Sequence, residues 1–331
     1  MELIRGGTEM NYSPDSRTAL IDNSNTDSEN NTSIKILNYD ILFSFSNYGS
    51  VTRLHANTFS CQRRGGKGVS FKRSHTGDFI ENLFTTFENT AHVCFTSFGR
   101  IFWLHTNMFL ENSLNDVDIE IEKLLLLKNQ EKVISLIPIP SSTKDFYIMI
   151  ATKHGLVQRT KFSEFPLLNI NGLYAMKLKE SDELISATFT NGIQDILLVT
   201  KHGMSIRFSE KDIHETKIYT SGKHSISLSN DDVVIGMTAI EDDSDLLVVS
   251  EKGFGKRTSL DEYRLQSRSG KGCSTYRVAQ KTGPLVGVTL INDTKDIFLI
   301  NDEGNIIRLE ALEIPVLSRE TQGVNLIETR N

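Results

Sequence analysis

A unit of about 50 residues recurs six times along this chain of 331 residues, and the repeat constrains the fold more than any other feature. Each copy has a short apolar run, a turn ending in glycine and a second run of alternating polarity. The turn glycines are Gly49, Gly99, Gly155, Gly203, Gly253 and Gly304, so successive copies start 50, 56, 48, 50 and 51 residues apart. Glycine adopts the positive φ that tight hairpin turns demand. Each unit is therefore predicted to open with a β-hairpin.

A second landmark predicts a further strand in five of the six units. An acidic residue precedes another apolar run at Asp78, Glu131, Asp182 and Asp232, and Gly283 stands at this place in the fifth unit. The chain ends at Asn331 before the sixth copy reaches this point, and we expect the start of the chain, at 34–37, to supply the missing strand. Six units of four short strands, with no helical periodicity, predict an all-β ring of six blades over 35–331.

The first 34 residues are of another kind. No apolar residue occurs in 22–33, so burial cannot offset the entropy of ordering this stretch. We therefore predict a flexible polar linker over 1–34. The insertion that lengthens the second unit carries the one helical signal, because 117–129 begins with strand alternation and continues as a helical turn.

Composition excludes several classes of function. The net charge of -6 excludes a protein that is basic throughout, so any affinity for nucleic acid must come from a local patch. The three cysteines are far apart and form no CxxC pair, which favours a reducing cytoplasm and no zinc site. No apolar run approaches the ~18 residues of a membrane span. Walker, HExxH and Ser-His-Asp patterns do not occur, so no catalytic residue, metal or cofactor is predicted.

One loop of the first unit carries the strongest chemical signal. It reads Gln62, Arg63, Arg64, Gly65, Gly66, Lys67, Gly68. The arginine forks suit phosphate oxygens, the lysine adds a point charge, and glycines bring the backbone close to a ligand. No Asp or Glu occurs in 53–77, which also contains Arg53, Lys72 and Arg73. This pattern favours contact with a polyanion, whereas the structural alternative is a solvated glycine-rich turn.

A second pattern places an arginine four residues after the turn glycine. It gives Arg53, Arg159, Arg207, Arg257 and Arg308, and the second unit has Trp103 there instead. Closure of the blades turns these positions into a ring of cations, which suits a bent DNA backbone. The alternative is that each arginine pairs with a carboxylate of its own blade.

Later units carry weaker versions of the basic loop. The fifth contributes Arg268 and Lys271 within 266–272, and the fourth contributes Lys223 within 219–223. The third and sixth units keep little beyond the glycine, at 169–172 and 319–323. We therefore expect a basic loop in units one, four and five.

With these features the chain resembles the C-terminal domain of the DNA gyrase A subunit over about 36–331, and 62–68 looks like that family's GyrA box in full. The resemblance implies a six-bladed β-pinwheel whose blades exchange strands and wrap duplex DNA with positive handedness. It implies partnership with the N-terminal breakage-reunion part of the gyrase A subunit, and with the gyrase B subunit, which carry the Mg²⁺ and ATP chemistry. It also implies a bacterial cytoplasmic, nucleoid-associated protein that introduces negative supercoils as part of gyrase.

Several alternatives stay open at this point. The second unit departs from the family pattern because it lacks both the arginine and a basic loop. A topoisomerase IV-like DNA-tethering domain is one alternative, although the resemblance implies fewer blades and no intact box for it, so six units and an intact box favour gyrase. A propeller scaffold for a protein partner is a second alternative, and an enzyme with a site in the central channel is a third that no residue cluster supports. Within the gyrase interpretation, we expect weak sequence preference and a box that clamps DNA between the first and last blades.

Overall fold

A computed structural model of the chain describes residues 41–46, 49–70, 80–87, 89–109, 119–140, 146–166, 172–301 and 303–329. All of these residues belong to one compact unit, Leu37–Asn331. The predicted linker at 1–34, the expected closing strand at 34–37, and Lys72 and Arg73 lie outside the described residues.

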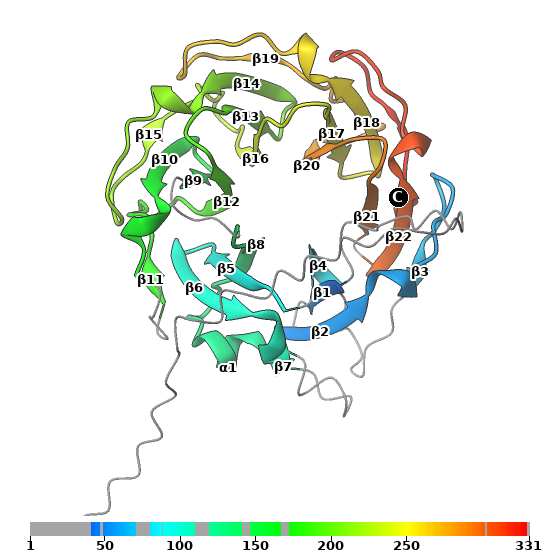
Figure 1. Cartoon of the computed structure of the whole chain (residues 1–331). Coiled ribbons are helices and arrows are strands. Elements are labelled where there is room, and N and C mark those ends of the chain that lie inside the picture. The colour runs from blue at the N-terminus through cyan, green and yellow to red at the C-terminus, as the bar shows by residue number, and fades with distance from the viewer. Residues whose placement is uncertain are drawn as a thin grey trace, which may run out of the picture. The chain divides into compact units, whose positions relative to one another are not determined.

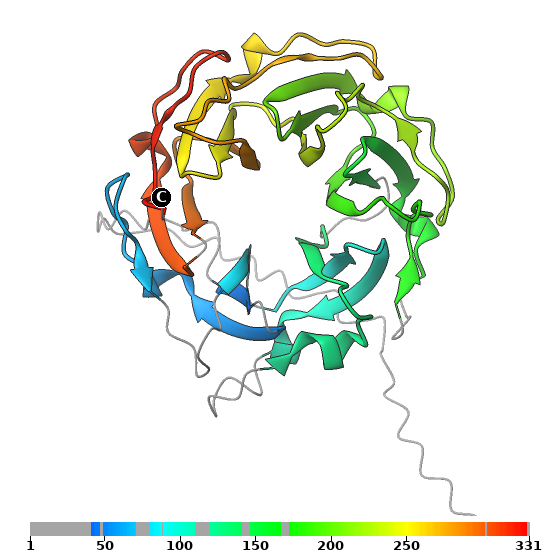
Figure 2. The ribbon, with the colours of Figure 1, turned by 180° about the vertical axis from the view of Figure 1, so that it is seen from behind.

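Six β-sheets stand in a ring around a central opening (Figure 1), and the view from behind shows the same circle of blades (Figure 2). The predicted all-β, six-bladed class is confirmed. Each blade contains the predicted hairpin. The hairpins are β1 (Ile41–Ser46) with β2 (Ser50–His55), β5 (Ala91–Thr96) with β6 (Arg100–His105), β9 (Tyr147–Thr152) with β10 (Leu156–Lys161), β13 (Asp195–Thr200) with β14 (Met204–Ser209), β17 (Asp245–Ser250) with β18 (Phe254–Ser259), and β21 (Asp296–Ile300) with β22 (Asn305–Glu310).

An inner strand follows the hairpin in the first five repeats, as the second landmark predicts. These strands lie nearest the central opening in Figure 1. They are β4 (Ile80–Thr86), β8 (Val133–Pro138), β12 (Leu184–Thr190), β16 (Val234–Ala239) and β20 (Leu285–Ile291). Within the described ranges the sixth blade has no such strand, and its sheet order is β21-β22-β3.

Each blade takes its outermost strand from the next repeat along the chain. These strands are β7 (Ile119–Glu120), β11 (Leu173–Tyr174), β15 (Lys223–His224), β19 (Cys273–Ser274), β23 (Val324–Asn325) and β3 (Val69–Ser70). The sixth blade receives β3 from the first repeat, where Val69 pairs with Ile306 and Ser70 with Asn305. The strand exchange that the resemblance implied is therefore confirmed, and it also closes the ring.

The first strand of each hairpin forms the core because neighbouring blades cover both of its faces. All six residues of β1 are buried, for example. One apolar cluster joins Met149 and Ala151 of the third repeat to Ile196 and Leu198 of the fourth. The apolar runs of the repeat are thus the contact surfaces between blades, which makes each blade dependent on the next.

In the third and fourth repeats the acidic landmark is hydrogen-bonded to the hairpin turn of its own blade. Asp182 Oδ1 accepts hydrogen bonds from the backbone N–H groups of His154, at 3.0 Å, and Glu183, at 3.0 Å. Asp232 does the same for His202 and Val233. One carboxylate oxygen thus accepts from an N–H of the turn and from the N–H that follows the aspartate, which gives a physical reason for an acid before the inner strand.

Short 3₁₀ helices link the hairpins to the outer loops. They are η1 (Ala56–Thr58), η2 (Thr106–Phe109), η4 (Phe162–Glu164), η5 (Glu210–Asp212), η6 (Leu260–Glu262) and η7 (Ala311–Glu313). The second repeat adds α1 (Ile121–Leu125) directly after β7, so the strand-then-helix character predicted for 117–129 is confirmed over the described residues from Ile119 onward. No helix among the described residues is long and apolar enough to cross a membrane.

Candidate nucleic-acid interface

The heptapeptide at 62–68 lies between η1 and β3, on the outer side of the ring, and joins the first repeat to the last (Figure 1). The Gln62 N–H donates to Arg308 O at 2.8 Å, and the Gly65 N–H donates to Leu326 O at 2.7 Å. Gly66 O accepts from the N–H of Glu328 at 3.0 Å. The backbone of this loop is therefore the latch that closes the ring.

The last glycine of the loop is required by this latch. Gly68 has φ +76°, and a Cβ there would lie 2.7 Å from Ile306 O. The equivalent glycines meet the preceding blade in the same way, with a Cβ at Gly272 2.0 Å from Ser205 O and one at Gly323 2.3 Å from Gly255 O. This close approach explains why the sixth unit keeps the glycine although its loop has lost most of the basic residues.

The three cations of the loop point their charge to solvent. Arg63, Arg64 and Lys67 are exposed, while the four other residues of the heptapeptide are half-buried. The main chain and the side chains of this loop therefore have different roles. Backbone groups hold the ring together, and three positive side chains remain accessible to an anionic ligand.

Three arginines of the glycine-x-x-x-arginine pattern brace neighbouring repeats. Arg308 donates to Asp296 Oδ2 through Nε, at 2.9 Å, and Nη2, at 2.6 Å, and its Nη1 donates to Ala56 O and Phe59 O at the η1 turn of the next repeat. Arg207 binds Asp195 and the η6 turn in the same manner. Arg257 pairs with Asp245 and Asp293 and reaches the η7 turn.

These contacts favour the second of the two interpretations of the pattern. Arg257 and Arg308 are only 5% and 6% exposed. Their guanidinium groups are paired with carboxylates of their own blade and with carbonyl groups of the next repeat. The aspartate partner always stands twelve residues before the arginine, at the start of the hairpin. Arg207 is half-buried and paired in the same way. A paired guanidinium with little exposed surface is a poor ligand for phosphate, so Arg207, Arg257 and Arg308 are not part of the proposed interface with DNA.

In the third and second repeats a different set of residues makes the contact with the next repeat. Arg159 donates to Glu210 O at 3.3 Å in η5, and its guanidinium lies 4.7 Å from the ring centre of Tyr147, which takes the place of the aspartate. Trp103 Nε1 donates to Pro166 O at 3.0 Å, just after η4. The tryptophan therefore keeps the hydrogen bond that reaches the next repeat. Arg53 is half-buried and has interactions of its own.

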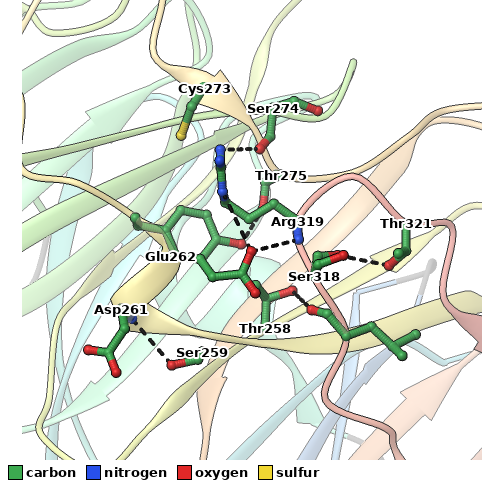
Figure 3. Close-up of polar contacts among 12 residues, drawn as sticks. Thr258, Ser259, Asp261, Glu262, Cys273, Ser274, Thr275, Ser318, Arg319 and Thr321 are labelled. Atoms are coloured by element: carbon green, nitrogen blue, oxygen red, sulfur yellow. Dashed lines mark hydrogen bonds and ion pairs between the residues drawn. The ribbon is translucent and has the colours of Figure 1, made fainter.

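In the later repeats, arginine side chains hydrogen-bond each outer loop to the preceding repeat. Arg268 donates to Asp212 O at 3.1 Å and to His224 O at 2.8 Å, both in the fourth repeat. Figure 3 shows the equivalent contact one repeat later, where Arg319 donates to Ser274 O at 3.0 Å and pairs with Glu262. Both arginines thus anchor their loops, whereas Lys223 and Lys271 are exposed.

Two titratable groups beside these loops have shifted pKa values. Burial lowers the pKa of Lys256 to about 8, and this side chain holds the sixth loop by donating to Ser318 O and Arg319 O. Burial and then the nearby Asp296 carboxylate raise the pKa of Cys61, so its thiol keeps its proton and donates to Asp296 Oδ2 at 3.6 Å. Neither group is arranged as a nucleophile, and both belong to the contacts between repeats.

Sequence reasoning missed a second acid-free stretch. No Asp or Glu occurs in 263–292, which contains five cations. Of these, Arg264, Lys271, Arg277 and Lys281 are exposed. Lys217 is likewise exposed on the fourth loop. The same signal that marked 53–77 was available here, on both sides of the weaker basic loop already predicted at 266–272. Within the part of the chain that the structure describes, no cluster of His, Cys, Asp or Glu could hold a metal ion.

Six blades in a ring, with outer strands exchanged between neighbours, define a β-propeller of the pinwheel type. The family model described as "DNA gyrase C-terminal domain, beta-propeller" matches residues 40–86, 147–191, 194–241, 244–292 and 295–331. The chain belongs to this family. The matched segments skip the second repeat, which carries α1.

Named relatives and solved structures agree with this family. The chain is 35% identical over 291 residues to the DNA gyrase A subunit of Staphylococcus epidermidis, covering 87% of this chain and 32% of that protein. It is 31% identical over 332 residues to the DNA gyrase A subunit of Salmonella typhimurium, covering 99% and 38%. The chain thus spans about a third of the length of these relatives.

Two solved structures share the fold. A DNA gyrase A C-terminal domain superimposes with a TM-score of 0.79 at 22% identity, covering 88% of this chain and 96% of that one. The C-terminal domain of a DNA topoisomerase IV gives 0.66 at 17% identity, covering 87% and 88%.

Proposed function

We propose that this chain binds duplex DNA along the outer loops of its ring and wraps it with positive handedness, as the C-terminal part of a DNA gyrase A subunit. The observation that carries the proposal is the cluster of exposed cations on outer loops of a protein whose net charge is -6. The cations lie on the loops of repeats one, four and five. They are Arg63, Arg64, Lys67, Lys217, Lys223, Arg264, Lys271 and Arg277.

The energetics require contacts distributed around the ring. Bending 20–30 bp by 40–90° costs about 1–6 kcal/mol, and a wrap through half a turn or more costs several times that. Three cations on one loop cannot offset such a cost. Cations on several loops can offset it if the loops keep a fixed spacing. The hydrogen bonds that Arg268, Arg308 and Arg319 donate to neighbouring repeats hold the loops at that spacing.

The ring latch gives the box a particular role in this proposal. Its cations lie where the first and last repeats meet, so DNA that reaches them has passed around the other loops and is held at the seam. Deletion of the box is expected to leave DNA binding through the fourth and fifth loops while wrapping is lost. Contact of Lys72 and Arg73 with DNA stays a prediction, as it does for Arg53 and Arg159.

Wrapping is proposed to serve strand passage in the whole enzyme. In this arrangement the N-terminal breakage-reunion part of the gyrase A subunit, together with the gyrase B subunit, carries out the Mg²⁺- and ATP-dependent steps. This chain presents DNA to them so that negative supercoils form. Its place would be the bacterial cytoplasm, at the nucleoid.

A ligation assay tests the proposal. Nicked plasmid is incubated with the purified chain, sealed with ligase and deproteinised, and its linking number is read on a gel. A positive shift that grows with protein concentration is expected. If about 6–10 phosphates are neutralised, affinity should also fall about 10³- to 10⁵-fold between 50 and 200 mM salt.

The similarity to a topoisomerase IV C-terminal domain supports a second candidate, DNA tethering without wrapping. Salt-dependent binding with no linking-number shift would select this candidate. No binding at 50 mM salt would contradict both and leave a scaffold for a protein partner.

A further inference from the structure

The outer loop of the fourth repeat holds a tyrosine in a backbone conformation that suits glycine. Tyr219 has φ +57°, and the equivalent residues of the first and fifth repeats are Gly65, at +77°, and Ser269, at +69°. A bulky side chain is disfavoured in this left-handed region. Tyr219 is 55% exposed, so the free energy of burying its ring in the core does not offset the backbone strain. Strain kept at an exposed position is characteristic of binding sites.

A second tyrosine and a lysine stand beside it. Tyr174, on β11, is 37% exposed, and its ring centre lies 6.0 Å from that of Tyr219. Lys128 Nζ lies 5.2 Å from the Tyr174 ring centre and donates to its hydroxyl at 2.5 Å. We call Lys128, Tyr174 and Tyr219 the tyrosine patch. Its three members come from three successive repeats.

The main chain prevents the Tyr219 ring from withdrawing. The Tyr219 N–H donates to Ala175 O at 2.9 Å, and the Lys177 N–H donates to Thr220 O at 3.0 Å. The residues on either side of the strained φ are therefore tied to the third repeat. The two rings are presented to solvent by a fixed backbone, which lowers the entropy lost when a ligand packs on them.

The two stretches that carry the tyrosines are positively charged. Neither 172–179 nor 216–230 contains an Asp or Glu. Lys177, Lys179, Lys217 and Lys223 are exposed in these two stretches. An apolar, rigid surface with lysines around it matches the chemistry of a duplex, in which sugars and the minor groove lie between two rows of phosphates.

We propose that the tyrosine patch is a DNA contact in which the two rings pack against the sugars and minor groove of the wrapped duplex while the surrounding lysines bind the flanking phosphates. The inference rests on the proposed function and adds the residues that serve the second and third repeats, where the basic loop is missing. Aromatic wedges in the minor groove also ease bending of the duplex, which a wrap needs at every blade.

The substitution Tyr219→Gly tests the patch because glycine removes the ring and relieves the φ strain at once. Thermal stability is expected to stay equal or rise. DNA affinity at 100 mM salt is expected to fall about 5-fold, the low end for loss of one aromatic stacking contact. The slope of log affinity against log salt should not change, because no phosphate contact is removed.

Two controls separate the ring from the loop. Ser269→Gly places glycine at the same loop position of the fifth repeat without removing an aromatic ring, so it should leave affinity near the wild-type value. Lys271→Ala removes a cation and should lower the salt slope by about 0.9. Tyr219→Asn, which tolerates positive φ, repeats the test if the glycine variant folds poorly.

The outcomes distinguish the two proposals. Wild-type protein that binds and wraps DNA, with Tyr219→Gly equal to it in affinity and linking-number shift, would overturn the patch alone. Wild-type protein that does not bind duplex DNA would overturn both. A weaker Tyr219→Gly with a changed salt slope would assign the loss to displaced lysines and would also contradict the contact by the rings.

Discussion

Replacing Gly68 with alanine tests directly whether the box closes the ring. The residue has φ +76°, which costs a residue with a Cβ about 1–2 kcal/mol. The new Cβ would lie 2.7 Å from Ile306 O and 2.9 Å from the Ile306 carbonyl carbon. Ile306 is held in β22 by its pairing with Ile300, so the overlap is relieved by moving β3 away from the sixth blade.

The strength of the latch sets the size of the effect. Among the described residues, three backbone hydrogen bonds outside the β3–β22 ladder close the seam, donated by the N–H groups of Gln62, Gly65 and Glu328. At about 0.5–1.5 kcal/mol net for each bond, they contribute about 1.5–4.5 kcal/mol together. The φ cost alone is a large part of this, before the close contact is counted. The β3–β22 ladder and the Arg308 bonds to Ala56 O and Phe59 O also hold the seam, so we expect Gly68→Ala to weaken it locally, with a fall in Tm of about 2–8 °C.

Hydrogen exchange is the measurement, with Gly66→Ala as the matched control. A Cβ at Gly66 would have no neighbour closer than 3.5 Å, and the residue has no positive φ. Both variants keep all three cations of the box. Gly68→Ala should lose protection in 62–70 and 305–308 and should lower the linking-number shift, while Gly66→Ala should match the wild type. Equal protection of 305–308 in the two alanine variants would refute the close-approach argument.

Three further predictions concern the contacts between repeats. Arg308→Met leaves Asp296 half-buried without its cationic partner, so we expect a loss of about 2–4 kcal/mol in the free energy of unfolding, measured with urea; an unchanged midpoint would contradict the brace. Lys256 has a folded pKa of about 8, below its unfolded value of 10.5, so the folded chain loses the proton first as pH rises. Wild-type stability relative to Lys256→Met should therefore rise by about 1–3 kcal/mol between pH 8 and 10.5 in urea titrations, and a flat difference would contradict burial of the charged form. Trp103→Phe removes the hydrogen bond to Pro166 O and should cost about 1 kcal/mol by the same method, whereas no cost would show that packing alone joins these repeats.

The blades were predictable because their signal is local. A hairpin needs a turn glycine and two apolar runs close together in the chain, and Gly203 between β13 and β14 shows the pattern clearly. The exchanged strands were implied only by the resemblance. Strands such as Val69–Ser70 are two residues long, too short for any periodicity, and their partners are decided by the geometry of the ring.

The roles of the arginines show where one pattern fits two structures. The spacing from the turn glycine identifies Arg207 and Arg308 as equivalent, but it suits a brace as well as a DNA contact. The aspartate twelve residues earlier, Asp195 or Asp296, decides between them, because adjacent strands bring these positions together. That signal was present in the sequence, and reading it requires the hairpin register first.

If the box binds DNA as proposed, DNA binding is coupled to ring closure, because the main chain of the box forms the latch and its side chains carry the charge. Arg63, Arg64 and Lys67 repel one another within a seven-residue loop that the closed ring holds in place. Phosphates that neutralise these cations remove the repulsion and stabilise the closed form. By linkage, closure then raises the affinity of the box for DNA by the same factor. We therefore expect duplex DNA to increase exchange protection of the Gly65 and Glu328 amides in the wild type. Gly68→Ala, in which the latch is strained, should lose part of this gain. Equal protection with and without saturating DNA would show that binding and closure are independent.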